Sequence, residues 1–271
     1  MLTKVRKEFI EDLPNLSQRY QSALPFPQIV LDDFFEEEIL NQILSEFPDL
    51  KAENEKDTIQ FKDKTGIKSA SKGERLFQES TRELLYFLNS ETFLQWLQKL
   101  TGIEEKLISD SYFSGGGLHE IKRGGLLKIH SDYNKHPETK LDRRINLLIY
   151  LNKEWKEEYG GHVEFWSKDM KECTKKILPI FNRVVIFNTL SNSYHGHPEP
   201  LNCPDNISRK SIALYYFSNG RPTEEINEEH TSIYKKRPGS RDLPLNVSDV
   251  LKLFVPPIFL PSTLKKWFKT K

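Results

Sequence analysis

The N-terminal part of the chain opens with a helical pattern of apolar residues. In the stretch 32–47 (DDFFEEEILNQILSEF), acidic residues fill the first turn, and Asp32 or Asp33 can cap the helix. The apolar side chains then fall on one helical face: Ile39, Leu40, Ile43, Leu44 and Phe47. A short strand is expected just before this helix, within residues 25–35. This region therefore predicts a strand followed by an amphipathic helix.

A second helical region covers residues 80–102 (STRELLYFLNSETFLQWLQKLTG). Its leucines and aromatic residues form two successive apolar faces, with Ser90 as a cap between them and Gly102 as a stop signal. We expect both faces to belong to the core. The segment between the helical regions, 50–79, is polar, rich in lysine and almost without periodicity. It predicts either a simple surface loop or a segment that covers a substrate.

From residue 108 onward the pattern changes to short apolar runs separated by Gly, Pro and Asn. The runs are GLHEIK, LLKIH, INLLIYLN, HVEFW, KILPIF, RVVIFN and SIALYYF. Closely spaced short strands predict a β-sandwich or barrel, and the continuous run 145–151 fits a strand covered on both faces. We expect one domain, with a helical support region over 1–107, a β-rich core over 108–220 and a C-terminal extension over 221–271.

The composition restricts the function classes. The chain has 40 Lys and Arg against 39 Asp and Glu, a net charge of +1, which argues against a protein built to bind nucleic acid. Its two cysteines lack the spacing of a zinc or redox motif. The charged N-terminus does not look like a secretion signal, and no apolar run approaches the ~18 residues that span a membrane. We expect a cytoplasmic globular protein, of unknown oligomeric state. The apolar residues of the tail, such as Leu251 and Phe254, predict docking onto the body, or a helix for a partner or membrane surface.

The segment KIHSDYNKH (128–136) places a histidine and an aspartate two residues apart. On a strand or an extended loop, this spacing puts the side chains of His130 and Asp132 on one face, close enough to bind one ion. Two histidines and one carboxylate on one face of a metal, with its other positions open, suit non-haem Fe(II) oxygen chemistry. Taken alone, the tripeptide HSD fits a polar loop at least as well, so the metal site depends on a third ligand.

The candidate third ligand is His195, which follows the apolar strand and the polar turn of RVVIFNTLSNSYHG. Arg209 stands at the start of the strand SIALYYF, where its planar guanidinium can bind a carboxylate through two hydrogen bonds. Tyr150 ends the run INLLIY and can present its phenol to the same carboxylate. Together these residues suggest a metal site beside an anion site.

Five ordered blocks, HSD, LLIYLNKEW, GGHVEFW, VVIFNTLSNSYHG and RKSIALYYF, lie within residues 108–218. In this order they resemble the 2-oxoglutarate/Fe(II)-dependent oxygenases, and most of all the prolyl 4-hydroxylase-like branch. The stretch LPFPQIVLDDFFEEEILNQILSEFP is similar to the N-terminal strand and helix of many bacterial members. The pair Gly160 and Gly161 corresponds to the tight turn before the next strand of the family.

The resemblance implies a mainly β fold, a double-stranded β-helix (jelly-roll) core with N-terminal helices packed on one sheet. It implies Fe(II) ligated by His130, Asp132 and His195. Arg209 would bind the distal carboxylate of 2-oxoglutarate, and Tyr150 would hydrogen-bond the same group. The expected activity is that of a dioxygenase: it hydroxylates a small metabolite or a protein prolyl side chain with dioxygen, and decarboxylates 2-oxoglutarate to succinate. Ascorbate is a candidate reductant.

Several alternatives remain open. His197, in HGHPEPL, is a rival third ligand. The stretch SGGGLHEIKRGG lacks the tyrosine-containing block common in prolyl hydroxylases, which leaves the substrate class undecided. A non-catalytic jelly-roll binding module would have lost or replaced the metal. A cupin-type metal enzyme that does not use 2-oxoglutarate would not need Arg209.

Other histidines and arginines carry weaker expectations. His119 is expected to be either a structural histidine or a residue of the pocket. His136 and His230 are expected on the surface. Arg143 and Arg144 stand at the start of a predicted strand, where a solvated position is the default and contact with an anionic substrate is the alternative.

Overall fold

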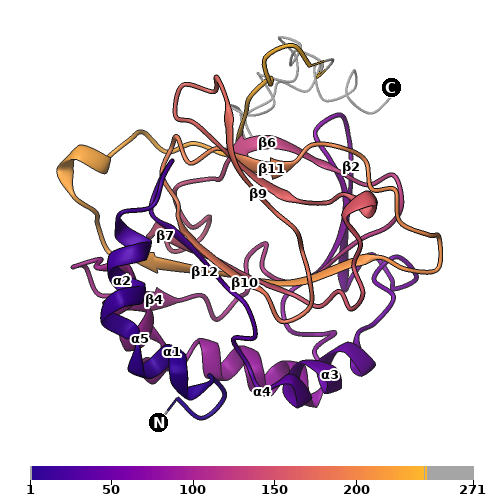
Figure 1. Ribbon diagram of the computed structural model, residues 1–271, viewed down its shortest axis with the longest axis horizontal. Helices are drawn as coiled ribbons and strands as arrows, with labels where there is room; N and C mark the ends of the chain where they lie inside the picture. Colours follow the sequence, from indigo (N-terminus) through magenta and orange to yellow (C-terminus); the bar gives the residue numbers. More distant parts are fainter. Residues whose placement is uncertain (1, 241, 243–271) are drawn as a thin grey trace.

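Two antiparallel sheets face each other, and helices cover the outer side of the larger sheet (Figure 1). The computed structural model describes residues 2–240 and residue 242. Within these residues the larger sheet has eight strands, ordered β1-β10-β7-β12-β5-β3-β2 with β4 paired to β12, and the smaller has five, ordered β13-β6-β11-β8-β9. The predicted β-rich core with helices packed on one sheet is confirmed.

The strand bounds show which apolar runs form which sheet. The larger sheet contains β1 (Gln28–Leu31), β2 (Thr58–Lys62), β3 (Ile67–Ser71), β4 (Ile108–Ser109), β5 (Gly117–Ile121), β7 (Asp142–Tyr150), β10 (Val184–Asn188) and β12 (Arg209–Ser218). The smaller sheet contains β6 (Leu127–Ser131), β8 (Val163–Trp166), β9 (Cys173–Ile177), β11 (His195–His197) and β13 (Ile233–Tyr234). Six of the seven predicted strands coincide with β5, β6, β7, β8, β10 and β12. The seventh, KILPIF, is displaced, because β9 ends at Ile177 and Pro179 cannot donate to a sheet.

Five α-helices lie among the described residues, and the main core forms between them and the larger sheet. They are α1 (Lys7–Glu11), α2 (Leu13–Gln21), α3 (Glu37–Glu46), α4 (Glu79–Leu88) and α5 (Glu91–Thr101). The predicted cap is confirmed, since the Ser90 side chain accepts a hydrogen bond from the Phe93 amide, and α5 ends at Gly102 with a φ of 70°. Phe93 and Trp96 are buried and stack at 5.5 Å between ring centroids, and Phe93 also contacts Tyr216 of β12.

Two helical details differ from the predictions. Neither Asp32 nor Asp33 caps α3, because that helix begins at Glu37 and its N-cap residue Glu36 makes no side-chain cap hydrogen bond. The turn before it is instead anchored by the buried rings of Phe34 and Phe35, which meet edge to face. Helices α1 and α2 were not predicted from the sequence, because their residues are mostly exposed and polar.

The polar segment 50–79 contains a β-hairpin that the sequence did not predict. Strands β2 and β3 pair with Gln60 opposite Ser69, and β3 continues the sheet by pairing with β5. A simple surface loop is therefore ruled out for residues 58–71. The predicted division at residues 107 and 220 stays a prediction, and the apolar tail positions 251, 253, 254 and 258 lie outside the described residues.

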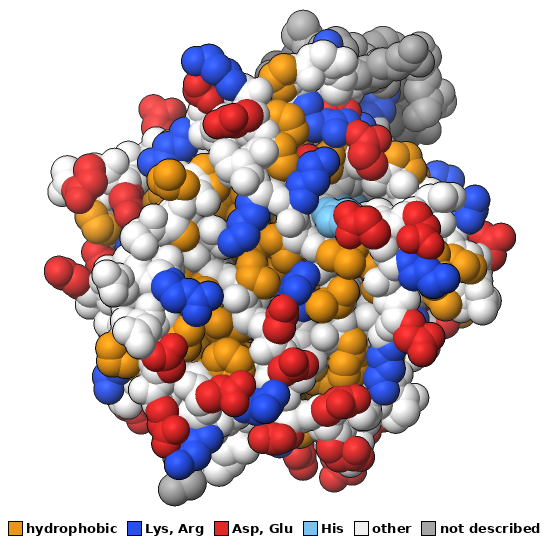
Figure 2. Space-filling view, in the orientation of Figure 1, with side chains coloured by type: hydrophobic (Ala, Val, Ile, Leu, Met, Phe, Trp, Pro, Cys, Tyr) orange, Lys and Arg blue, Asp and Glu red, His pale blue; other side chains and the backbone are white. Residues whose placement is uncertain are grey.

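Charge and hydropathy agree with the composition. On the face shown in Figure 2, Lys and Arg side chains are interspersed with Asp and Glu, and the net charge of the chain is +1. Within residues 2–240 and 242, no helix combines the length and apolar character needed to cross a membrane.

Candidate metal centre and its cavity

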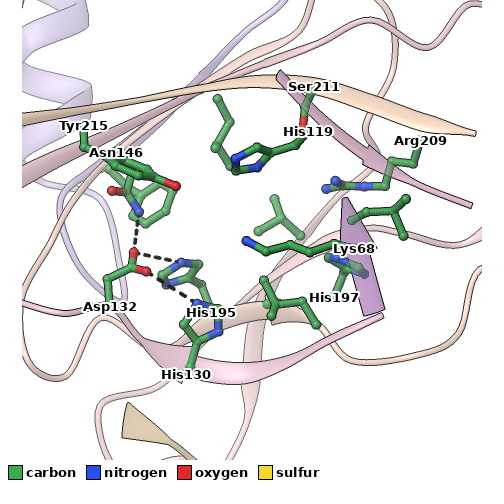
Figure 3. A pocket seen from close by; sticks show the side chains of 16 residues that line it. Lys68, His119, His130, Asp132, Asn146, His195, His197, Arg209, Ser211 and Tyr215 are labelled. Atoms are coloured by element: carbon green, nitrogen blue, oxygen red, sulfur yellow. Dashed lines mark hydrogen bonds and ion pairs between the residues drawn. The ribbon is translucent and has the colours of Figure 1, made fainter. Parts of the chain in front are cut away.

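Three predicted ligands meet between the two sheets. His130 stands near the end of β6, Asp132 follows that strand, and His195 lies directly opposite His130 on β11. Each residue offers one possible ligand atom, and these three atoms lie within 4.8 Å of one another. All three side chains are buried. The two imidazole Nε2 atoms face the two oxygens of Asp132, at 3.5 Å for His130 and 3.4 Å for His195 (Figure 3).

The hydrogen bonds of the two imidazoles decide which nitrogen faces the carboxylate. Nδ1 of His130 lies 2.8 Å from the Lys128 carbonyl, and Nδ1 of His195 lies 2.9 Å from the Ser193 carbonyl. A carbonyl only accepts, so each neutral ring carries its proton on Nδ1 and leaves a lone pair on Nε2. Two lone pairs then face a carboxylate, an arrangement that a cation between them stabilises. The donor set therefore fits a divalent metal.

The protonation states suit ligation as well. Burial lowers the pKa of His130 and outweighs the opposing effect of Asp132, which keeps the imidazole neutral. Burial alone would raise the pKa of Asp132, but the positive charge of Arg143 holds it well below its ordinary value. The amide of Asn146 donates to Asp132 Oδ2 at 2.6 Å, and the Arg143 guanidinium lies 3.2 Å from the same oxygen. The carboxylate is thus ionised and fixed in orientation.

The rival histidine lies in the same cavity but outside the cluster. His197 is on the same strand face as His195, and the register with β6 shifts between these two residues. Among the described residues, neither of its ring nitrogens has a hydrogen-bond partner, although the side chain is buried. Burial and the positive charge of Arg209 hold its pKa well below the ordinary value. His197 is a neutral residue of the cavity wall rather than a member of the three-residue cluster.

Arg209 and Tyr150 form the second predicted element. Arg209 begins β12 and is buried; its Nε donates to the Gly161 carbonyl at 2.9 Å, and its guanidinium lies 3.2 Å from the Tyr150 hydroxyl. Among residues 2–240 and 242, no carboxylate pairs with this cation, so an anion is needed to balance it. Gly161 has a φ of 75°, and a Cβ there would lie 2.6 Å from Leu201 and 3.0 Å from Arg209. Glycine is required for this close packing.

Two cavities meet at the cluster. An inner cavity of about 90 Å³ is lined by the three cluster residues and by Arg209, His119 and His197, among others (Figure 3). An outer cavity of about 230 Å³ is lined by aromatic residues from four segments: Phe61, Tyr133, Tyr215 and Tyr234. Both cavities share Lys68, His130 and Asp132. The arrangement offers a small polar compartment beside the metal position and a larger aromatic one.

Several residues of the site were not predicted. Lys68 lies on the hairpin that the sequence pattern did not reveal, and Tyr234 lies in the segment after the core. Asn146 lies in a continuous apolar run, between an isoleucine and a leucine. A single polar side chain in such a run was the sequence feature that could have marked it as a site residue. The hairpin of segment 50–79 lines the outer cavity. That this segment covers a substrate stays a prediction.

The expected exposure of Arg143, Arg144 and His136 was wrong, and the expected exposure of His230 is met in part. Arg143 and Arg144 are 1% and 4% exposed instead of solvated. Arg143 stacks on Tyr215 at 3.5 Å from the ring centroid, and Arg144 pairs with a glutamate at 2.7 Å. His136 is buried against Phe217, with ring centroids 5.1 Å apart, and His230 is partly covered and bonded to a serine hydroxyl. Pairing with partners distant in sequence compensates these polar groups.

His119 makes the metal-free protein sensitive to acid. Burial and the positive charge of Lys68 lower the pKa of His119 to about 3, although its hydrogen bond to the Gly115 carbonyl acts in the opposite direction. In the unfolded chain the same imidazole titrates near 6.5. The contribution of neutral His119 to the free energy of unfolding is therefore fully present above about pH 6.5. It decreases by about 1.4 kcal/mol per pH unit as the pH falls toward 3, because the unfolded chain binds a proton that the folded protein does not. We expect His119→Gln to flatten this dependence, measured by urea unfolding with a chelator between pH 7.5 and 4.5. Equal slopes for the two proteins would contradict the assignment.

Comparison with known proteins shows which family the region around this site resembles. The family model of the 2OG-Fe(II) oxygenase superfamily matches residues 116–217, which include all three cluster residues, Tyr150 and Arg209. Mouse prolyl 3-hydroxylase OGFOD1 is 26% identical over 131 residues, which are 47% of this chain and 22% of the mouse protein. The match thus covers only about a fifth of that relative.

Two solved structures share the fold. A prolyl hydroxylase from Trichoplax adhaerens, in complex with a peptide fragment of hypoxia inducible factor, has a TM-score of 0.56 at 17% identity over 79% of this chain and 94% of its own. A Pseudomonas putida prolyl-4-hydroxylase has a TM-score of 0.51 at 14% identity over 77% of this chain and 100% of its own. The predicted double-stranded β-helix is confirmed. Residues 116–217 are thus similar in sequence to the 2OG-Fe(II) oxygenase superfamily.

Proposed function

We propose that this protein is an Fe(II)- and 2-oxoglutarate-dependent dioxygenase that hydroxylates its substrate. The observation that carries the proposal is the pair of imidazole lone pairs facing one ionised carboxylate, with an uncompensated arginine across the same cavity. His130, Asp132 and His195 would hold the iron on one face. This is the donor set that non-haem Fe(II) oxygenases use.

The other residues of the cavity have binding and orienting roles in this proposal. Arg209 would bind the far carboxylate of 2-oxoglutarate, and Tyr150 would donate a hydrogen bond to the same group. Arg143 and Asn146 would keep Asp132 ionised and correctly turned. Bound iron and 2-oxoglutarate supply the oxidation by dioxygen, with succinate and CO2 as coproducts, while the protein supplies orientation and a dry compartment.

The substrate can be a small molecule or a peptidyl side chain. The names of the mouse, Trichoplax and Pseudomonas proteins favour a prolyl side chain, and the aromatic outer cavity has room for a side chain of that size. Ascorbate as reductant and a cytoplasmic location stay predictions. The oligomeric state stays open.

The direct test of the proposed function is the fate of labelled 2-oxoglutarate. We expect slow formation of labelled succinate when the protein is mixed with Fe(II), dioxygen and 2-oxoglutarate, even without the true substrate. The reaction should stop when a chelator removes the iron and should be absent in His130→Ala. If the intact protein binds neither Fe(II) nor 2-oxoglutarate, the proposal is wrong and a non-catalytic jelly-roll module becomes the better account.

The two candidate third ligands can be separated by substitution. We expect His195→Ala to lose Fe(II) binding by more than about 100-fold, because even outer-shell changes at metal sites cost 10–100-fold. His197→Ala should change Fe(II) affinity by less than about threefold, because that ring lies outside the cluster. Titration of Fe(II) under anaerobic conditions measures both. The reverse ranking would assign the metal to His197.

A further inference from the structure

Lys68 occupies a position in line with Arg209 across three strands. Ser69 of β3 lies opposite Glu120 of β5, and Ile121 of β5 lies opposite Arg209 of β12. Continuing this register by one residue places Lys68 opposite Ile121, about 10 Å from Arg209 at the usual strand spacing. Because side chains alternate between sheet faces, both cations point to the inner face. In Figure 3 the Lys68 side chain reaches from the sheet into the cavity, between Arg209 and the metal cluster.

Within the described part of the chain, the Lys68 ammonium has no counter-ion. Among residues 2–240 and 242, no carboxylate lies within ion-pair distance of it and no hydrogen-bond acceptor reaches it. Burial lowers its pKa; the charge of Asp132 opposes this effect, and the charges of Arg143 and Arg209 reinforce it. A lysine held among other cations is costly unless a ligand brings negative charge.

The charges that line the two cavities also indicate that an anionic group is missing. The linings contain three cations, Lys68, Arg143 and Arg209, and one carboxylate, Asp132. Arg143 already pairs with Asp132, and Asp132 would also face the metal. Arg209 accounts for one carboxylate of a bound dicarboxylate. One cation, Lys68, is therefore left for a second anionic group.

We propose that Lys68 is a second carboxylate-binding residue of this site, separate from Arg209. The proposal rests on the proposed function, since it takes 2-oxoglutarate as one ligand of the inner cavity. Lys68 lines both cavities, so the carboxylate can come from 2-oxoglutarate itself or from an acidic group on the primary substrate. In either case the hairpin β2–β3 contributes a specificity-determining residue to the active site.

The test compares three variants of the full chain loaded with Fe(II) under anaerobic conditions. Lys68→Met removes the charge and keeps the length, and Lys68→Arg keeps the charge. Lys62→Met is the matched control, because Lys62 lies on the same hairpin with its side chain exposed to solvent. Calorimetry gives the affinity for 2-oxoglutarate, and then the affinity for propionate, a simple monocarboxylate, with and without saturating 2-oxoglutarate. Thermal melting confirms that each variant is folded.

We expect Lys68→Met to lower the affinity for one of these ligands by about tenfold or more. This is the usual effect of losing a charge-assisted hydrogen bond. Lys68→Arg should recover part of the loss, and Lys62→Met should match the unmodified protein. Weaker 2-oxoglutarate binding assigns Lys68 to the cosubstrate; weaker propionate binding alone assigns it to the primary substrate. Unchanged affinity for both ligands, or no propionate binding together with unchanged 2-oxoglutarate binding, overturns the proposal.

Failure of the proposed function gives a different result. If the unmodified protein does not bind 2-oxoglutarate at all, the dioxygenase proposal fails. The propionate titration of the Fe(II)-loaded protein then still decides whether Lys68 binds a carboxylate, because it does not require the cosubstrate.

Discussion

Replacing Asp132 with asparagine is expected to abolish specific Fe(II) binding and, with it, the formation of succinate. The carboxylate lies between two imidazole lone pairs, and among the described residues it supplies the only negative charge in the lining of either cavity. An amide of the same size leaves two neutral ligands and no charge to balance the metal. We expect the Fe(II) affinity to fall by more than about 100-fold, because loss of a ligand exceeds the 10–100-fold cost of outer-shell changes. Anaerobic titration with Fe(II) measures this loss.

The matched control for this substitution is Asp142→Asn. Asp142 is also a buried, ion-paired aspartate, held by Lys135 at 2.9 Å and Arg221 at 3.2 Å, but it lines neither cavity. We expect its substitution to lower stability and leave Fe(II) affinity within about threefold, because it lies outside the donor set. If Asp132→Asn held iron as tightly as the unmodified protein, the ligand assignment would be refuted.

The second large effect is expected for Arg209→Met, which should weaken the binding of 2-oxoglutarate without changing the affinity for Fe(II). Removing one partner of a buried, hydrogen-bonded charge pair costs about 2–5 kcal/mol. At 1.4 kcal/mol per tenfold change, the dissociation constant should rise by about 30-fold or more. Calorimetry with 2-oxoglutarate on the Fe(II)-loaded protein measures the change.

Graded and control variants make the Arg209 experiment specific. Tyr150→Phe removes only the hydroxyl beside the guanidinium, so its effect should stay below about tenfold, the size of one neutral hydrogen bond. Arg144→Met changes another buried arginine, which pairs with Glu105 outside both cavities, and should leave 2-oxoglutarate binding unaltered. Equal 2-oxoglutarate affinity in Arg209→Met and the unmodified protein would favour a cupin-type metal enzyme.

The sequence predicted the fold wherever burial leaves a strong local pattern. The run at 145–151 was recognised as a strand covered on both faces, and eight of the nine residues of β7 are indeed buried. The hairpin β2–β3 was not recognised, because most side chains of β2 are exposed and the segment lacks a continuous apolar run. Its strand character comes from pairing with β5, a contact far away in sequence.

The candidate site divides in the same way. The cluster of His130, Asp132 and His195 followed from the spacing of two ligands and from ordered motifs that resemble a known family. The side chains that control the cluster could not be predicted, because they depend on strand register. Arg143 pairs with Asp132 across a turn, and Lys68 enters the cavity only because β3 joins the sheet beside β5. Long-range register is not visible in local periodicity.

The two edge strands line the outer cavity, whereas the proposed metal ligands lie on or beside internal strands. β2 ends the larger sheet and β13 ends the smaller one, and each pairs with a neighbour on one side only. Both contribute to the wall of the outer cavity, through Ile59 and Phe61 on β2 and Tyr234 on β13. The proposed metal ligand His195 instead lies on an internal strand with neighbours on both sides. Substitutions in the two edges can therefore reshape the substrate compartment while the internal registers that hold the ligands stay intact, so a new specificity requires no rebuilding of the metal centre.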